Sequence, residues 1–334
     1  MTHPRSTLIS LEDTPYYHIV SRCIRKSFLC GLDVSSGKNF EHRRQWIADR
    51  LILLASAFSI EIASYAIMSN HYHLVLCVND RATQHWSMRE VLERWCMVFR
   101  GPTEVQDYLS GKTLNDTAIR RVSDYANLFR SRLCSISWFM RCINEPIARM
   151  ANREDNCTGR FWEGRFKSQA LLDESAVLSA MAYVDLNPIR AQLADTPESS
   201  DFTSIQDRIE RIKRSQHVSH INTAASTPKH LQSFSGNAYS NEPSGIPIRL
   251  EEYLHLVDWT GKILRDDKNG YIPENIPPIL ERLKIDTKQW LYCTQHFESR
   301  FKKFVGKYHS IQKICQSLNH HWVQGIRNCR MAFG

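Results

Sequence analysis

The segment IEIASYAIMSNHYHLVLCV, residues 60–78, decides the fold. It holds two apolar runs, residues 60–68 and 71–78, which are rich in the β-branched and aromatic residues that favour strands. Met-Ser-Asn at 68–70 makes a tight connection between the two runs. The segment therefore predicts a β-hairpin, around which a small sheet can form.

The second run of this hairpin carries the triplet His71-Tyr72-His73. Alternate side chains of a strand point to the same face, so the two histidines project together and Tyr72 projects from the other face. Two adjacent imidazoles can bind a divalent metal ion. Taken alone, however, the triplet is more typical of two polar residues on a solvated strand face.

The segments on either side of the hairpin predict an α+β fold. Residues 16–23 and 161–172 predict two further strands. The predicted helices are residues 38–57, 88–99, 129–151, a segment from the N-cap Asp173 to Pro188, and residues 203–214. This order favours a small antiparallel sheet with helices on one face. Residues 101–128 show no pattern that predicts an element.

Net charge and cysteines narrow the class of protein only a little. The net charge of +8 suits a polyanionic partner, but many basic proteins bind nothing acidic. None of the ten cysteines forms a C-x-x-C pair, which is typical of reduced thiols in a cytosolic protein. The N-terminus lacks the apolar core of a secretion signal, and the most apolar stretch, residues 51–68, is too short and polar to span a membrane. We therefore expect a cytoplasmic protein that does not bind a membrane.

A second pair of candidate residues, Tyr183 and Asn187, lies near the end of a predicted helix. Residues four apart share one face of a helix, so the two side chains lie together. The phenol of Tyr183 is a covalent nucleophile once a base or a metal activates the site. The amide oxygen of Asn187 is a hard ligand suited to Mg²⁺ or Mn²⁺. Taken alone, Tyr183 is more typical of a half-buried aromatic residue, and Asn187 before Pro188 is more typical of a helix stop.

Four segments in a fixed order carry a resemblance to a known family. They are YHIVSR (17–22), MSNHYHLVL (68–76), GRFWEGRFKS (159–168) and YVDLNPIRA (183–191). Together they resemble the REP-associated tyrosine transposases, which belong to the single-tyrosine HUH transposases of bacterial insertion sequences. In the H-U-H motif, U is a bulky hydrophobic residue, and Tyr72 takes that place. The resemblance covers roughly residues 14–195.

The resemblance implies a role for each matching residue. His71 and His73 match the metal-binding histidines. Tyr183 matches the nucleophile, and Asn187 matches the polar residue that completes the metal site. The resemblance also implies a ferredoxin-like fold, single-stranded DNA with hairpin recognition as the substrate, and a homodimer. The implied activity is that of a metal-dependent transposase of a mobile element, which cleaves and rejoins DNA through a 5′-phosphotyrosine in the bacterial cytoplasm, at the nucleoid.

This chemistry explains why such residues are needed. A metal ion on a non-bridging oxygen withdraws charge from the phosphodiester and orients it for in-line attack. The covalent tyrosine link keeps the bond energy, so a second DNA end can reverse the step without ATP. Two imidazoles and one amide are neutral ligands, so the full charge of Mg²⁺ or Mn²⁺ acts on the phosphate. The residues do not decide between these two ions.

Basic and aromatic residues lie where a single DNA strand would need them. Residues 118–168 hold ten Lys and Arg against five Asp and Glu. Aromatic rings that stack on bases and cations that contact phosphates are the usual scheme for single strands. The candidates for DNA contact are Arg22, Arg160, Trp162, Arg165 and Lys167, with Arg25 and Lys26 as weaker ones. The alternative is that the aromatic residues are sheet core and the cations are only solvated.

Three domains follow from the resemblance and the composition. Residues 1–200 are the predicted HUH catalytic domain, with an insertion at about 85–128. Residues 201–247 are a helix and a linker rich in Ser, Asn, Thr, Gly and Pro. Residues 248–334 are mostly helical and form a predicted accessory domain.

Aromatic residues recur at helical spacing in this accessory domain. They are Trp290, Phe297, Phe301, Phe304 and Tyr308. Such a stripe is more typical of helix packing than of a platform for bases. Asp286 with Gln289 predicts a capping box at a helix start. Our hypothesis is that this domain contacts DNA or a partner.

Two other functions fit parts of the pattern. A domesticated, sequence-specific DNA-binding protein without cleavage activity would keep the fold, although the intact histidines and Tyr183 argue against such decay. A replication initiator or relaxase shares the H-U-H chemistry but often has a pair of tyrosines. No second tyrosine lies close to Tyr183 in the sequence. A covalent protein–DNA adduct would separate the transposase from the non-cutting protein.

Overall fold

The computed structural model describes residues 9–24, 29–33, 37–217, 230–236, 245–265, 277–318 and 323–334. Arg25, Lys26 and most of the predicted linker lie outside the described residues. The strands are β1 (Tyr16–Arg22), β2 (Ile60–Ile67), β3 (His71–Val78), β4 (Lys167–Leu171) and β5 (Phe304–Val305). The helices of the first part are α1 (His42–Ala57), α2 (Asp80–His85), α3 (Met88–Cys96), α4 (Thr103–Leu109), α5 (Asp116–Leu133), α6 (Ile136–Glu154), α7 (Glu174–Asp185), α8 (Asn187–Arg190), η2 (Pro197–Ser199) and α9 (Ser204–His217). The helices of the last part are α10 (Leu250–Arg265), α11 (Pro278–Leu283), α12 (Thr287–Arg300), α13 (Tyr308–Ser317) and α14 (Ile326–Phe333).

The five strands form one sheet in the order β2-β3-β1-β4-β5. β1 lies between β3 and β4, as in the ferredoxin-like order that the resemblance implies, and it runs antiparallel to β4. The α+β class with a helical C-terminal region is confirmed. The sheet is nevertheless mixed where we predicted an antiparallel one, because β5 pairs in parallel with β4. A strand of two residues is too short to show the period of two that reveals strands in a sequence.

The helices of the middle region differ from the prediction. The pattern predicts one helix at 129–151, but α5 ends at Leu133 and α6 begins at Ile136. Ser135 has an extended backbone, and its hydroxyl accepts a hydrogen bond from the Trp138 amide as an N-cap. The apolar spacing continues across this break and hides it. Nothing among the described helices is long and apolar enough to cross a membrane.

Two predicted elements are shorter than expected. α1 begins at His42, although the apolar spacing starts a few residues earlier. β4 covers only Lys167–Leu171 of the predicted strand at 161–172, because residues 163–165 form a bend. Before this bend Trp162 makes a single bridge to Cys23. The strand that positions candidate residues is therefore the short one after the bend.

The chain divides into two compact units. Unit 1 consists of Met1–Arg22, Ile62–Leu76 and Arg165–Gly334. Unit 2 consists of Cys23–Glu61 and Cys77–Gly164. These units do not follow the domain boundaries near residues 200 and 248 that the sequence suggests, and that division stays a prediction.

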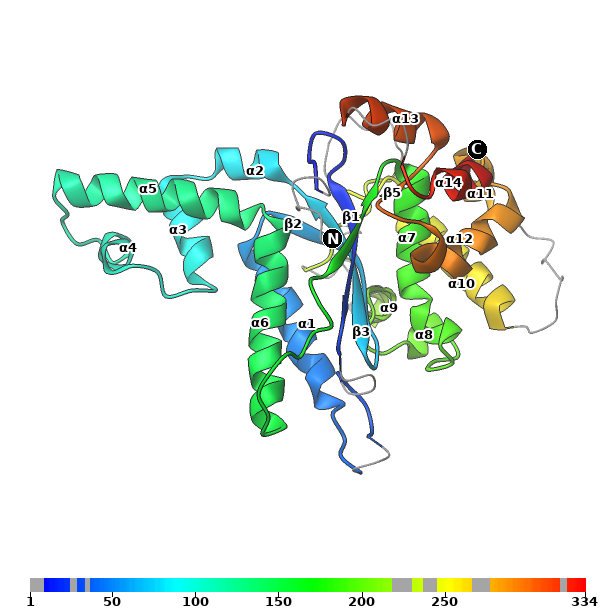
Figure 1. Ribbon diagram of the computed structural model, residues 1–334, viewed down its shortest axis with the longest axis horizontal. Helices are drawn as coiled ribbons and strands as arrows, with labels where there is room; N and C mark the ends of the chain where they lie inside the picture. Colours follow the sequence, from blue (N-terminus) through cyan, green and yellow to red (C-terminus); the bar gives the residue numbers. More distant parts are fainter. Residues whose placement is uncertain are drawn as a thin grey trace. The chain divides into compact units, whose positions relative to one another are not determined.

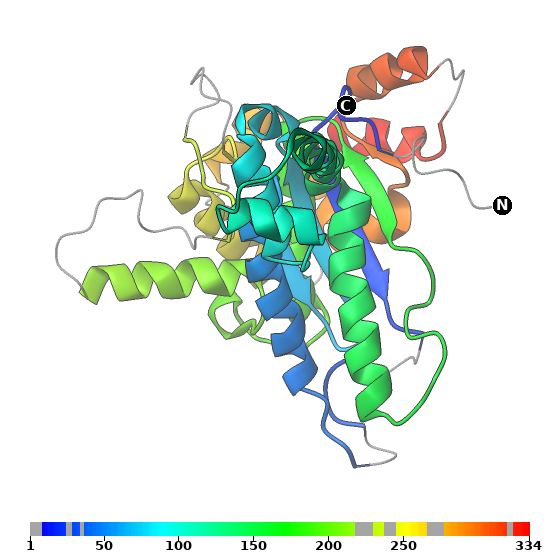
Figure 2. The same cartoon turned by 90° about the vertical axis from the view of Figure 1, so that its left-hand side faces the viewer.

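Unit 2 is built from helices that pack against one another. α1 lies alongside α6 (Figure 2), and both α3 and α4 contact α5. The fully buried Arg43 of α1 donates a hydrogen bond to Glu154 at 2.7 Å and also pairs with Asp155. Removing one partner of a buried charge pair costs about 3–5 kcal/mol, so these carboxylates are needed to hold Arg43 inside.

Unit 1 places helix α7 against helix α12 (Figure 1). α7 begins at the predicted N-cap, where Asp173 accepts a hydrogen bond from the Ala176 amide at 3.1 Å. Every residue from Ser175 to Asp185 is buried, as expected of a helix that is covered on several sides. The predicted capping box at Asp286 is present at the start of α12.

Four of the five aromatic residues of the C-terminal stripe are packing core, as their spacing indicates, whereas Tyr308 is only partly buried. Trp290 and Phe297 are fully buried in α12, and Phe301 just after it is 1% exposed. The rings of Phe297 and Phe301 contact each other with centroids 5.2 Å apart. The C-terminal region therefore shares its core with the rest of unit 1.

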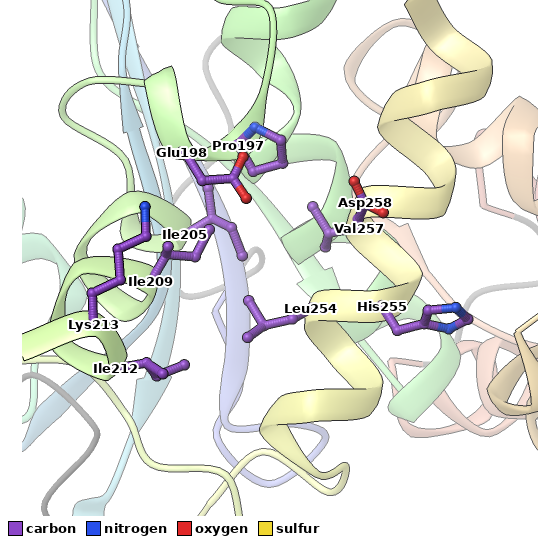
Figure 3. A pocket seen from close by; sticks show the side chains of 10 residues that line it. All are labelled: Pro197, Glu198, Ile205, Ile209, Ile212, Lys213, Leu254, His255, Val257 and Asp258. Atoms are coloured by element: carbon purple, nitrogen blue, oxygen red, sulfur yellow. The ribbon is translucent and has the colours of Figure 1, made fainter. Parts of the chain in front are cut away.

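Helices α9 and α10 of unit 1 line an apolar groove with a volume of about 350 Å³ (Figure 3). Ile205, Ile209 and Leu254 contribute apolar side chains, and Lys213 and Asp258 contribute charges. None of the residues that line the groove is a candidate from the sequence.

Candidate active site

Strand β3 and helices α7 and α8 bring four of the predicted site residues together. His71 and His73 have ring centroids 4.7 Å apart. The Tyr183 ring of α7 meets the His73 ring nearly at right angles, with centroids 5.5 Å apart. Asn187 lies at the start of α8, one turn further, and its side chain is close enough to the Tyr183 hydroxyl to lower the pKa of the phenol. The phenol and the imidazoles therefore lie on the same side of the sheet.

A third histidine, His18 of β1, belongs to this cluster and does not stand out in the sequence. Its ring stacks on the His73 ring with centroids 5.2 Å apart, and its Nε2 lies 3.0 Å from His73 Nδ1. Its Nδ1 lies 2.6 Å from Oε1 of Gln169 on β4. β1 lies beside β3, which makes neighbours of two histidines 55 residues apart in the sequence. The available signal was a histidine at a strand position whose neighbours are apolar.

The Tyr183 phenol is enclosed by an aromatic ring and a cation. Its side chain is 5% exposed, and the ring of Phe297 lies 5.7 Å away. The guanidinium carbon of Arg190 lies 4.0 Å from the centre of the phenol ring, and Arg190 donates a hydrogen bond to the Thr294 carbonyl at 3.0 Å. Burial raises the pKa of Tyr183, whereas the charge of Arg190 and the polar side chains of Arg190 and Asn187 lower it. Arg190, another residue that sequence reasoning missed, thus favours the phenolate.

The imidazoles of the cluster are neutral at neutral pH, which is the form that binds metal ions. Burial lowers the pKa of His73 well below its usual value, and the neighbouring His71 and His18 lower it further. Burial also lowers the pKa of His71 to about 4, with a further contribution from the charge of Arg22. The pKa of His18 is lowered by burial as well.

The residues present fit a divalent cation held by imidazole and amide groups. In the part of the chain that the structure describes, the buried Nε2 of His73 and the buried Nδ2 of Asn187 lack a hydrogen-bond partner. Buried polar atoms without a partner are rare and need an explanation, such as an ion. A half-turn of the Asn187 amide would exchange the nitrogen for the oxygen that hard cations prefer. Among the described residues, no group of three or more His, Cys, Asp or Glu could hold a metal ion.

Arg22 and Lys167, two of the predicted DNA contacts, lie in unit 1 and share one carboxylate. Each has a nitrogen 3.6 Å from an oxygen of Glu298 on α12. The side chain of Arg22 is 41% exposed and that of Lys167 is 67% exposed, so both reach solvent. Glu298 is also close enough to raise the pKa of Tyr183. The two cations and the phenol are therefore parts of one electrostatic environment.

A cleft of about 290 Å³ opens beside His18. Three lysines line it, Lys167, Lys302 and Lys303, against the single carboxylate of Glu298. A concave surface with an excess of positive charge concentrates anions. The C-terminal region thus adds two cations, Lys302 and Lys303, to those of residues 118–168.

The remaining predicted DNA contacts differ from one another in exposure. Arg160 of unit 2 and Arg165 of unit 1 are exposed. Trp162 of unit 2 is 8% exposed, and its indole N–H donates a hydrogen bond to the Asn144 carbonyl at 2.8 Å. This burial corresponds to the alternative in which the aromatic residues are core. We therefore do not propose Trp162 as a platform for bases.

Comparison with known proteins adds one distant relation. No family model matches the chain, and no curated protein matches it. A solved structure of a REP-associated tyrosine transposase bound to a REP hairpin is similar over 74% of this chain and 99% of that chain, with a TM-score of 0.37. The two sequences are 12% identical over this similarity.

Proposed function

We propose that this chain is a transposase that cleaves and rejoins single-stranded DNA through a covalent bond to Tyr183. The observation that carries the proposal is the position of the phenol against the rings of His73 and His18, with Arg190 over its face. A tyrosine that only fills the core needs neither a cation on its ring nor a buried imidazole with an unpartnered nitrogen. Both features suit a nucleophile that must lose its proton beside a phosphate.

Tyr183 supplies the attacking atom. Its oxygen forms a bond to phosphorus while the bond between phosphorus and the 3′-oxygen breaks. The phenol gives up one proton and the departing 3′-oxygen takes up one, which leaves a 5′-phosphotyrosine and a free 3′-hydroxyl. Arg190 lowers the free energy of the phenolate through its charge. The 3′-hydroxyl of a second DNA end can then attack the phosphotyrosine and rejoin the strands.

His71, His73 and Asn187 are the residues that would hold Mg²⁺ or Mn²⁺ in this proposal. When bound, such an ion withdraws charge from the scissile phosphate and orients it. The protein keeps the imidazoles neutral by burial and fixes the His71 ring through a hydrogen bond between its Nδ1 and Asn70 at 2.5 Å. Ligands that are already held in position lose less conformational entropy when they bind a metal ion.

The DNA backbone would lie along the lysine-lined cleft beside His18. Arg22, Lys167, Lys302 and Lys303 offer four cations for phosphates. The sequence resemblance favours a substrate with a hairpin and a homodimeric enzyme. Arg160 and Arg165 are further candidates for backbone contacts, because both are exposed.

Incubation of the full chain with a library of single-stranded DNA hairpins, labelled at the 3′ end, tests the proposal. With Mn²⁺ we expect a labelled protein–DNA adduct that survives denaturing electrophoresis, because the 5′-phosphate of the labelled fragment stays on the tyrosine. EDTA should abolish the adduct. Binding without any adduct, in Mg²⁺ as in Mn²⁺, would instead support the DNA-binding protein without cleavage activity.

Glu298→Gln should strengthen DNA binding. The carboxylate competes with DNA phosphates for Arg22 and Lys167, and exposed pairs of this kind are each worth about 0.2–1 kcal/mol. We expect the Kd for hairpin DNA to fall about 3- to 10-fold at about 50 mM salt, with a smaller change at about 200 mM. Fluorescence anisotropy with labelled DNA measures it.

Glu210→Gln is the matched control for this change. Glu210 pairs with Arg214 on α9, so its substitution removes the same charge from a pair elsewhere in unit 1. The Kd of this variant should stay within about twofold of the wild type, since salt screens the effect of a change in net charge alone. Equal gains in the two variants would mean that Glu298 acts only through net charge.

A further inference from the structure

A chain of hydrogen bonds connects the C-terminal region to the imidazole of His73. It runs from the Phe301 carbonyl through Gln169 to His18, and from His18 to His73. Its three donor–acceptor distances are 2.8, 2.6 and 3.0 Å. Gln169 is 8% exposed, and both histidines are fully buried. Water cannot easily replace a hydrogen-bond partner at such buried groups, so each group depends on its neighbour in the chain for its hydrogen bond.

The orientation of the Gln169 amide follows from its partner at one end. The Phe301 carbonyl can only accept a hydrogen bond, so the amide nitrogen Nε2 of Gln169 must point to it. The amide oxygen Oε1 then points to Nδ1 of His18. The opposite orientation would place two oxygens against each other and leave two buried groups unsatisfied.

The orientation of this amide determines where the histidine protons lie. Because Oε1 of Gln169 only accepts, Nδ1 of His18 carries a proton and donates it. A neutral His18 then has a lone pair on Nε2, which accepts from Nδ1 of His73. His73 is thereby protonated at Nδ1, and its Nε2 carries the lone pair. That Nε2 is the buried atom without a partner among the described residues.

We propose that Gln169 and His18 are positioning residues that fix the tautomer of His73, so that Nε2 of His73 is held ready as an electron-pair donor. The consequence for metal binding rests on the proposed function, whereas the tautomer itself does not. Partners of this kind behind a ligating histidine fix its ring and its tautomer. The C-terminal region thus contributes to the site through the carbonyl of Phe301, which lies just after α12.

The proton positions can be measured in the metal-free full chain by long-range ¹H–¹⁵N NMR of ¹⁵N-histidine. We expect His73 and His18 both to be protonated at Nδ1 in the wild type. In Gln169→Leu, Nδ1 of His18 loses its acceptor, so either arrangement of the two protons leaves one buried N–H unpaired, at His18 Nδ1 or at His73 Nε2. We therefore expect the tautomers no longer to be fixed and the Nε2-protonated forms of both histidines to become populated. Gln169→Glu in its protonated form donates its O–H to the Phe301 carbonyl and keeps an acceptor oxygen toward His18, so it should restore the wild-type tautomers. His18→Asn and His73→Asn variants assign the resonances.

Binding of Mn²⁺ alone, followed by electron paramagnetic resonance of the free ion, is the second readout. We expect Gln169→Leu to weaken Mn²⁺ binding about 10- to 100-fold and Gln169→Glu to restore most of it. Gln232→Leu is the matched control, because Gln232 is 4% exposed and hydrogen-bonds to Tyr16 elsewhere in unit 1. It should change neither the tautomers nor the Mn²⁺ affinity.

The outcomes separate this proposal from the proposed function. A His73 protonated at Nε2 in the wild type would overturn it, even if Gln169→Leu does not fold. Unchanged tautomers in a folded Gln169→Leu would overturn it as well. The expected tautomers with no Mn²⁺ binding in any variant would support the hydrogen-bond chain and contradict the proposed metal site.

Discussion

Replacing Tyr183 with Phe should abolish the covalent protein–DNA adduct and leave DNA binding nearly unchanged. The substitution removes only the hydroxyl that attacks phosphorus, so the adduct should fall by at least about 10³-fold. The ring that packs against His73 and Phe297 remains, and the cations of the cleft are untouched. Denaturing electrophoresis measures the adduct, and fluorescence anisotropy measures the Kd for hairpin DNA.

Tyr292→Phe is the control for this prediction. Tyr292 lies on α12 in the same unit, is only partly buried, and contacts the ring of His296. Loss of the Tyr292 hydroxyl should leave the amount of adduct at the wild-type level. An adduct that persists in Tyr183→Phe and disappears in Tyr292→Phe would mean that Tyr292, and not Tyr183, is the nucleophile. An adduct that persists in both would require a nucleophile other than these two.

The parts of the site that the sequence predicts are those with a local pattern. The hairpin shows in its two apolar runs and their tight connection, and the two histidines of its H-x-H triplet must share a face. Tyr183 and Asn187 lie one helical turn apart, and Asp173 marks the start of their helix. Each of these inferences needs only residues that are close in the sequence.

The parts that the sequence does not predict depend on contacts between distant segments. His18 contacts His73 because β1 lies next to β3 in the sheet. Gln169 contacts His18 because β4 pairs with β1. Glu298 and Thr294 reach the neighbourhood of Tyr183 only because α12 packs on α7. The aromatic stripe of α12 correctly indicates a buried face, but helical spacing does not say which helix that face covers.

The end of α7 is held by a buried polar network around Asp185. Its fully buried carboxylate accepts hydrogen bonds from the hydroxyls of Tyr253 and Ser204, each at 2.5 Å, and from Ser64 at 3.1 Å. Burial raises the pKa of Asp185, whereas these hydrogen bonds and the charge of Arg208 lower it. Burial lowers the pKa of Arg208 to about 10, and the charge of Asp185 acts in the opposite direction. The network connects α7 to β2, α9 and α10.

Asp185→Leu should lower the free energy of unfolding by about 3–5 kcal/mol, because it removes the buried negative charge that acts most strongly on the buried Arg208. It also leaves the buried hydroxyl of Tyr253 without its acceptor, whereas Ser64 and Ser204 keep longer hydrogen bonds to the Met181 and Tyr65 carbonyls. Asp185 lies between Tyr183 and Asn187, so loosening this end of α7 should also reduce adduct formation in the folded fraction. Urea denaturation followed by circular dichroism measures the stability. Asp258→Ala is the control, because its pair with Lys262 is exposed and worth about 1 kcal/mol or less.

The double variant Asp185→Leu with Arg208→Met separates the loss of charge pairing from the loss of packing. If Asp185 matters because it compensates Arg208, removing both charges should recover about 1–3 kcal/mol relative to the sum of the single changes. Strict additivity would mean that the hydroxyl hydrogen bonds, not the charge, make Asp185 important. A single Asp185→Leu that costs no more than Asp258→Ala would contradict the network altogether. Because Ser204, Arg208 and Tyr253 all follow residue 200, the expected result makes the later part of the chain a structural requirement for the helix that carries the nucleophile.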